Sequence, residues 1–203
     1  MTLTLFESIQ RIVQDELQSV RTAELAVVQE QHPADPDNYA CTVVLRDSGI
    51  VLRNVPVATS RIGAVAIPAV GELVLVQFVG GDVNAPVIVG RLYNDRDRPP
   101  ENEDGRAVLH LPLGAADGDA VHVELKSGAT RELSIKLGDG LTFVLRDDDP
   151  VVEIDAGGQA KVTIERDGTV AVKSSGKLEL KASEIKVEAE GKLTLKGATV
   201  NIN

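Results

Sequence analysis

The second half of the chain repeats one short pattern, and this repeat constrains the fold more than any other feature. From Val152 onward, two apolar residues flank a single, mostly polar one, as in VEI, VTI, VAV, LEL, IKV, LTL and VNI. The seven triplets start 10, 8, 8, 7, 8 and 7 residues apart, with turn residues between them. Because side chains of a strand alternate between its faces, each triplet predicts a short strand with one apolar face. Regular spacing of this kind indicates a repeat architecture.

Strands this short need partners, and two arrangements satisfy them. Three triplets can form one turn of a single-chain β-helix, or three chains can wind around a common axis. Two turns of a single-chain solenoid leave most units at an end, whereas three intertwined chains pair the strand edges between them. We therefore favour a trimer. Its expected core consists of the inward residues Val162, Ile164, Val170, Val172, Leu178, Leu180, Ile185, Val187, Leu193 and Leu195.

The composition supports an all-β protein and excludes some partners. Aromatic residues make up only 2% of the chain and Trp is absent, so Val, Leu, Ile and Ala must form the core, which suits strands. The net charge is −10, which argues against nucleic acid as a partner because phosphate binding needs a basic surface. It also disfavours an anionic membrane surface.

One helix is expected, at the N-terminus. Apolar residues recur there with helical spacing, and Thr4 and Glu7 have the spacing of a capping box. The sequence predicts a docking helix over residues 1–22. The residues expected to dock it on a hub are Leu5, Phe6, Ile9, Ile12 and Val13.

Residues 23–98 read as a small barrel. Short strands are expected in ELAVVQEQ, YACTVVLRD, IVLRNVPVA, LVLVQF and VIV, with a hairpin turn at Gly80, Gly81 and Asp82. Five or six short strands in about 70 residues indicate a Greek-key barrel of the OB type. The polar stretch NDRDRPPENEDG, residues 94–105, marks a boundary, and residues 99–203 form the expected neck and needle.

The chain carries no sign of an oxidising compartment or a membrane span. A lone Cys41 in an apolar run is expected to be a core residue. No apolar run approaches the roughly 20 residues of a spanning helix, and the N-terminus lacks the features of a signal peptide. We expect cytoplasmic synthesis.

No catalytic, cofactor or metal site is predicted. His110 and His122 occupy polar positions between apolar neighbours, and His32 lies in a turn. A metal needs three or four converging donors. The acidic run Asp147–Asp149 lacks the spacing and glycine of a calcium loop, so we expect a solvated turn. Ser60, Ser127 and Ser174 lie in no nucleophile-elbow setting, and we predict no enzyme.

The segments PAVGELVLVQF and GGDVNAPVIVGRLYN and the Pro-rich exit after them carry a resemblance. The barrel resembles the OB domain of the phage baseplate assembly protein V and VgrG group, the central spikes of contractile injection systems. The short repeats that follow resemble the trimeric β-helix needle of that family. Together the resemblance covers about residues 23–203.

The resemblance implies a structural, membrane-puncturing spike of a phage tail-like particle or an extracellular injection system, which crosses the target membrane transiently. The implied partners are two further copies of the chain, hub, baseplate and inner-tube proteins, and a PAAR-type tip protein. The chain lacks the large hub domains of full VgrG proteins and the lysozyme-like insertion of some phage spikes, so we expect a separate hub. It also lacks their His-x-His apex, and the expected docking surface for the tip is therefore Thr199, Val200, Asn201, Ile202 and Asn203.

A second interpretation stays open from the residues alone. An oligomeric β-helical adhesin, or a module that binds a surface glycan, would show the same strand repeats. Co-purification with tube, hub and tip proteins distinguishes the two.

Overall fold

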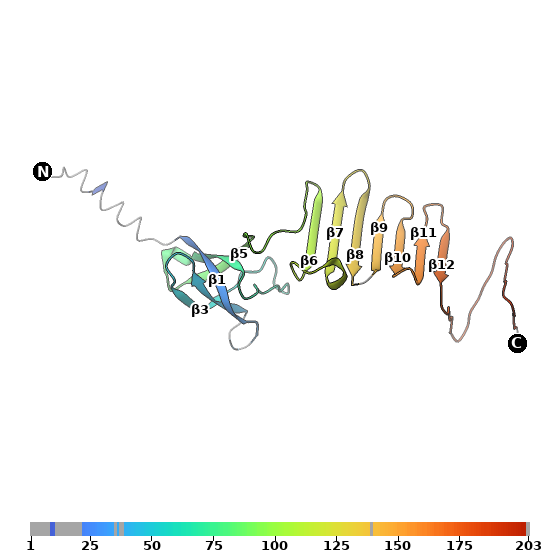
Figure 1. Cartoon of the computed structure of the whole chain (residues 1–203), viewed down its shortest axis with the longest axis horizontal. Helices are drawn as coiled ribbons and strands as arrows, with labels where there is room; N and C mark the ends of the chain where they lie inside the picture. Colours follow the sequence, from blue (N-terminus) through green and yellow to red (C-terminus); the bar gives the residue numbers. More distant parts are fainter. Residues whose placement is uncertain (1–8, 11–21, 35, 37–38, 139, 202–203) are drawn as a thin grey trace. The chain divides into compact units, whose positions relative to one another are not determined.

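The computed structural model describes residues 9–10, 22–34, 36, 39–138 and 140–201 of the 203-residue chain. The chain divides into two compact units, Met1–Asn102 and Glu103–Asn203. Each unit contains one antiparallel sheet (Figure 1). The two units are described separately below.

The first unit contains the five strands that the sequence predicts for a barrel. They are β1 (Ala23–His32), β2 (Ala40–Leu45), β3 (Val51–Pro56), β4 (Leu73–Phe78) and β5 (Pro86–Leu92). Their order in the sheet is β3-β2-β1-β4-β5. The predicted hairpin turn between β4 and β5 is confirmed as the short 3-10 helix η1 (Val79–Gly81), in which Gly80 and Gly81 have φ angles of 64° and 79°. Such positive φ angles favour glycine.

The two edge strands of this sheet meet, which closes it into a barrel. Val57, directly after β3, forms a parallel bridge with Ile88 of β5. The backbone N–H of Ala58 donates to the carbonyl oxygen of Ile88 at 2.8 Å. A five-stranded sheet closed in this way is the barrel of an OB-fold.

Aliphatic side chains fill the barrel, as the composition predicts. The core cluster consists of Ala26, Val28, Cys41, Val43, Leu45, Val55, Val74, Val76, Phe78 and Ile88. Cys41 has no exposed surface, and burial raises the pKa of its thiol. The prediction that Cys41 is a core residue is confirmed.

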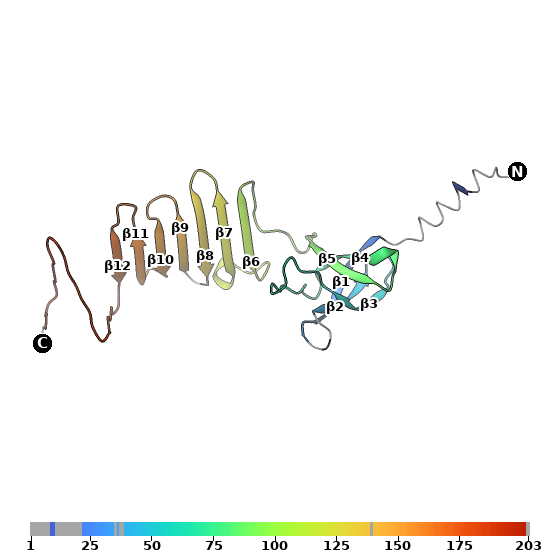
Figure 2. The same ribbon diagram turned by 180° about the vertical axis from the view of Figure 1, so that it is seen from behind.

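The second unit is a seven-stranded meander in which the strands follow one another in sequence order (Figures 1 and 2). The strands are β6 (Arg106–Leu111), β7 (Val121–Ser127), β8 (Arg131–Leu137), β9 (Leu141–Arg146), β10 (Val152–Ala156), β11 (Ala160–Ile164) and β12 (Val170–Ser174). A short 3-10 helix, η2 (Asp117–Asp119), lies between β6 and β7. The first three triplets of the repeat form β10, β11 and β12, as predicted.

Within the described residues, the triplets after β12 form no strand. The structure describes residues 175–201 without regular secondary structure, and Leu178, Leu180 and Ile185 are 63%, 70% and 51% exposed. A strand exists only through its hydrogen-bonded partner, and the partner expected for these triplets comes from other chains. Within the described residues, the series of paired strands therefore ends at β12.

The predicted N-terminal helix lies almost wholly outside the described residues. Leu5, Phe6, Ile12 and Val13 belong to the part of the chain that is not described, and Ile9 is the one docking residue that is. Helix and hub docking remain predictions.

Candidate assembly interface

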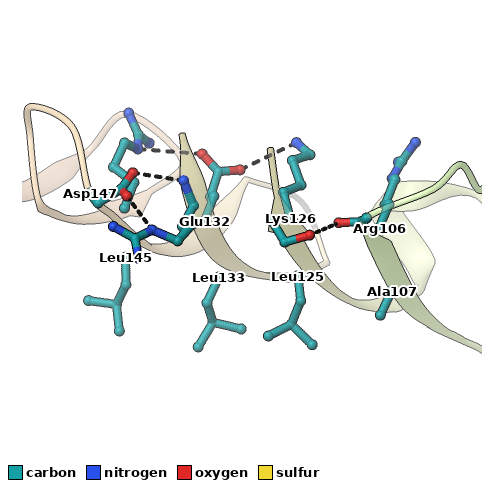
Figure 3. A pocket seen from close by; sticks show the side chains of 12 residues that line it. Arg106, Ala107, Leu125, Lys126, Glu132, Leu133, Leu145 and Asp147 are labelled. Carbon is teal, nitrogen blue, oxygen red and sulfur yellow. Dashed lines mark hydrogen bonds and ion pairs between the residues drawn. The ribbon is translucent and has the colours of Figure 1, made fainter. Parts of the chain in front are cut away.

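Most apolar side chains of the strands of the second unit lie on one face of its sheet. The strand register aligns them in rows across the strands, and the middle row consists of Leu109, Val123, Ile135, Phe143, Ile154, Val162 and Val172. Figure 3 shows the alternation on neighbouring strands: Leu125, Leu133 and Leu145 point to one side of the sheet, and Lys126, Glu132 and Asp147 to the other.

This apolar face is uncovered in the single chain. Leu109, Ile154 and Val172, from the first, fifth and last strands of the sheet, are 51%, 38% and 53% exposed. The apolar residues of β12 that the sequence assigned to a trimer core, Val170 and Val172, are among the most exposed of the sheet. A continuous apolar surface of this kind on a folded sheet marks an interaction site.

The opposite face carries a row of alternating charges, here called the charge ladder. It consists of Arg106, Glu124, Lys126, Glu132, Arg146, Glu153, Lys161 and Asp155. Arg106 pairs with Glu124, and the successive pairs Glu124–Lys126, Lys126–Glu132, Glu132–Arg146, Arg146–Glu153, Glu153–Lys161 and Lys161–Asp155 have N–O distances of 3.2, 3.4, 3.5, 3.9, 2.9 and 4.0 Å. Each link bridges adjacent strands or same-face neighbours of one strand, so the ladder crosses the sheet from β6 to β11.

Glu124 is the most buried charge of the ladder, with 6% of its side chain exposed. Burial alone raises the pKa of its carboxyl, but the hydrogen bond and charge of Lys126, joined by Arg106, outweigh burial and lower the pKa. A carboxylate buried to this degree is stable only when it is paired. The long side chains of Arg106 and Lys126 provide that pairing and also cover the polar face.

The acidic run after β9 stabilises turns, as predicted. Asp147 accepts hydrogen bonds from the backbone N–H and the Nε–H of Arg131 at 2.7 and 2.6 Å, and these bonds lower the pKa of its carboxyl. Asp149 accepts from the backbone N–H of Arg166 at 2.6 Å.

His110 and His122 lie on the polar face, as their positions in the sequence predict, but they are not isolated surface residues. They oppose each other in the β6–β7 register, with their Nδ1 atoms 3.1 Å apart. The signal that could have shown this pairing is that both occupy the centre of an apolar–His–apolar triplet, LHL and VHV. Among the described residues, no group of three or more His, Cys, Asp or Glu side chains is arranged to hold a metal ion.

Among the described residues of the barrel, the aromatic side chains do not form a platform of the kind that stacks nucleotide bases. Phe78 is buried, and the hydroxyl of Tyr39 accepts a hydrogen bond from the backbone N–H of Ala66 at 2.7 Å. Tyr93 is exposed, and the loop between β3 and β4 presents Ile62 and Val65, which are 90% and 78% exposed.

The structure places the predicted site residues in separate regions. Val162, Ile164, Val170 and Val172 share the apolar face of β11 and β12. Leu178, Leu180, Ile185, Val187, Leu193 and Leu195 are exposed in the segment after β12. Of the predicted tip surface, Thr199, Val200 and Asn201 are described and exposed, whereas Ile202 and Asn203 lie outside the described residues.

An OB barrel and an all-β unit with an uncovered apolar face define a structural assembly protein. Residues 47–93, which include β3, β4 and β5, match the family described as the type VI secretion system/phage-baseplate injector OB domain. By this domain the chain resembles the VgrG-like baseplate spike proteins. This agrees with the resemblance noted from the sequence.

A curated relative gives the same assignment. Over 43 residues the chain is 44% identical to the "Actin cross-linking toxin VgrG1" of Vibrio cholerae serotype O1 (strain ATCC 39541 / Classical Ogawa 395 / O395). The match covers 21% of this chain and 4% of the relative, so the chain spans only a small part of that protein's length. The toxin activity in that name belongs to the relative.

The matched family is described as an OB domain of type VI secretion and phage-baseplate injectors, and the similarity is limited to that domain. In the described part of the chain, no helix has the length and hydropathy needed to cross a membrane.

Proposed function

We propose that three copies of the chain form the central spike of a contractile injection system. In this proposal the OB barrels associate with hub and inner-tube proteins, and the second units and the segments after them form an intertwined β-helical needle. The needle ends on a separate PAAR-type tip protein and punctures the target membrane when the system contracts.

The observation that carries the proposal is the uncovered apolar face of β6–β12. An isolated sheet with half-exposed Leu, Val and Ile side chains across seven strands leaves apolar surface in water, which costs about 25 cal/mol per Å². Three copies placed around one axis remove this surface from water, because each apolar face then turns toward the axis. The charge ladder on the opposite face remains in solvent.

The segment after β12 supports the same arrangement. Its triplets keep the apolar–polar–apolar alternation of β10–β12, yet they have no strand partner within the described chain. Paired between chains, the same residues gain both backbone hydrogen bonds and a shared interior. The open strand ends of Thr199, Val200 and Asn201 would then form a platform, and exposed strand ends invite pairing with another protein. We assign this platform to the tip.

The mass of the full chain in solution tests the proposal first. Light scattering coupled to size-exclusion chromatography should give three times the 21.5 kDa of one chain, and a monomer at working concentrations would overturn the spike. Deleting Val200–Asn203 should leave the trimer intact and abolish co-purification with the tip protein. If the truncated trimer still retains the tip, the docking assignment is wrong. A stable oligomer that associates with glycans but with no hub, tube or tip protein would favour the adhesin.

A further inference from the structure

The two histidines on the polar face make one direct contact that the proposed spike does not use. His110 of β6 and His122 of β7 face each other with ring centroids 5.4 Å apart and Nδ1 atoms 3.1 Å apart. The shorter Nδ1 separation shows that both Nδ1 atoms lie between the rings. This distance is that of an N–H to N hydrogen bond, which needs a donor on one ring and an acceptor on the other.

A second contact fixes which ring donates. The Nε2 atom of His110 lies 3.0 Å from the carbonyl oxygen of Ala115, and a carbonyl can only accept, so His110 carries its hydrogen on Nε2. In the neutral pair, the Nδ1 of His110 is therefore the acceptor and the Nδ1–H of His122 is the donor. Only one hydrogen atom can therefore lie between the two Nδ1 atoms.

The number of hydrogens decides how the pair responds to acid. A first added proton leaves the contact intact, because it can sit on the Nε2 of His122 while Nδ1–H still donates to His110. A second added proton makes both rings imidazolium ions. Two N–H groups and two positive charges would then face each other at 3.1 Å, and the rings must separate.

We propose that His110 and His122 form an acid-sensitive clasp between β6 and β7, which accepts one proton and opens on the second. The clasp lies on an edge, because within the described chain β6 pairs with β7 alone. Opening it loosens the first strand of the sheet and leaves β8–β12 paired. The inference concerns contacts within one chain and does not depend on the proposed spike.

Of the charged groups near the histidine pair, one lysine adds to the repulsion between the protonated rings. The nearby carboxylates are either paired with other side chains or exposed to solvent. Lys136 of β8 is opposite His122 in the register, so its positive charge adds to the repulsion when both rings are charged. Glu124, two residues along β7, is already paired with Arg106 and Lys126. Asp119 of η2 has an exposed side chain, so its charge is screened by solvent.

Hydrogen exchange of the β6 amides, expressed as protection relative to an unfolded peptide, tests the clasp in the full chain. Histidines change charge between about pH 5 and pH 8, so the measurement runs from about pH 8 down to about pH 4.5. Because the open form binds one more proton, protection of β6 should fall by up to about tenfold per pH unit once the second proton binds. Protection of β9 should change less.

The matched variant is His122→Asn. Its amide reaches the same point as Nδ1 and can rotate to present N–H or C=O to His110, so the contact survives in acid and the fall in β6 protection should disappear. His32→Asn is the control, since His32 lies in the barrel and contacts Thr42 Oγ1 at 2.9 Å, and it should behave like the unsubstituted chain. His110→Asn provides a second variant in which the fall should also disappear.

Two results would overturn the clasp. One is a fall in β6 protection of equal size in the chain with His122→Asn. The other is constant protection across the whole pH range in the unsubstituted chain. The chain has three histidines, so their ring signals in NMR spectra can be assigned with these same variants and followed over the same pH range.

Discussion

Adjacent residues on β12 allow the assembly to be tested by one matched pair of substitutions. Val172 lies on the apolar face and is 53% exposed in the single chain, whereas Ala171 lies on the opposite face and opposes Thr163. We expect Val172→Asp to dissociate the trimer and Ala171→Asp to leave it intact. Both variants add the same charge to the same strand, so only the face differs.

The expected loss of association free energy follows from the exposed fraction of the Val172 side chain. Full burial of a valine side chain contributes about 1.5–3 kcal/mol, and about half of that remains to be gained on association, or about 1 kcal/mol per chain. Val172→Asp loses this term three times and places three carboxylates in a shared interior, each at a cost of several kcal/mol. The total is on the order of 10 kcal/mol per trimer, which weakens association by about seven factors of ten.

Sedimentation or light scattering over a dilution series measures this effect directly. In the single chain, the aspartate of Val172→Asp stays hydrated, so β6–β12 should remain folded, and circular dichroism should lose only the strand signal of the segment after β12. The reasoning is refuted if the Val172→Asp protein remains trimeric at low concentration, or if Ala171→Asp dissociates equally.

Four further substitutions test the energetics of the two units. Glu124→Gln should lower the free energy of unfolding by about 1–3 kcal/mol at neutral pH. Because the native pKa of Glu124 is lowered, the difference between variant and unsubstituted chain should shrink as the pH falls below about 4. Urea titrations that give the same difference at every pH would contradict this prediction. Gly71→Ala should cost about 1–3 kcal/mol because Gly71 has a φ angle of 93°, whereas Gly90→Ala, with open space around the new Cβ, should avoid this penalty. Ile88→Ala should destabilise the barrel by about 2–5 kcal/mol. If its midpoint of unfolding in urea equals that of the unsubstituted chain, Ile88 does not stabilise the core.

The sequence predicted the strands of the barrel because alternation and turn residues are local signals. Cys41 could be assigned to the core from its apolar neighbours, and the η1 turn from its two glycines. The bridge between Val57 and Ile88 could not be predicted, because it joins residues from opposite edges of the sheet. Closure of the barrel depends on how strongly the strands twist, which no single segment determines.

The candidate site was partly predictable for the same reason. The alternation assigned Val162, Ile164, Val170 and Val172 to one face before any register was known. The charge ladder and the histidine pair depend on register, because Lys126 meets Glu132 and His110 meets His122 only in one alignment of neighbouring strands. The strands expected at Leu178–Leu195 do not form in the single chain, and the pairing partners that we propose for them belong to other chains.

The charge ladder has a consequence for how the sheet reaches its final pairing during folding. A slip of one residue between β7 and β8 would bring Leu125 opposite Glu132 and turn apolar side chains toward the charged face. A slip of two residues in one direction would bring Glu124 opposite Glu132, two like charges at cross-strand distance. Seven short, similar strands offer many incorrect alignments, and the sign of each charge makes several of them costly within the single chain.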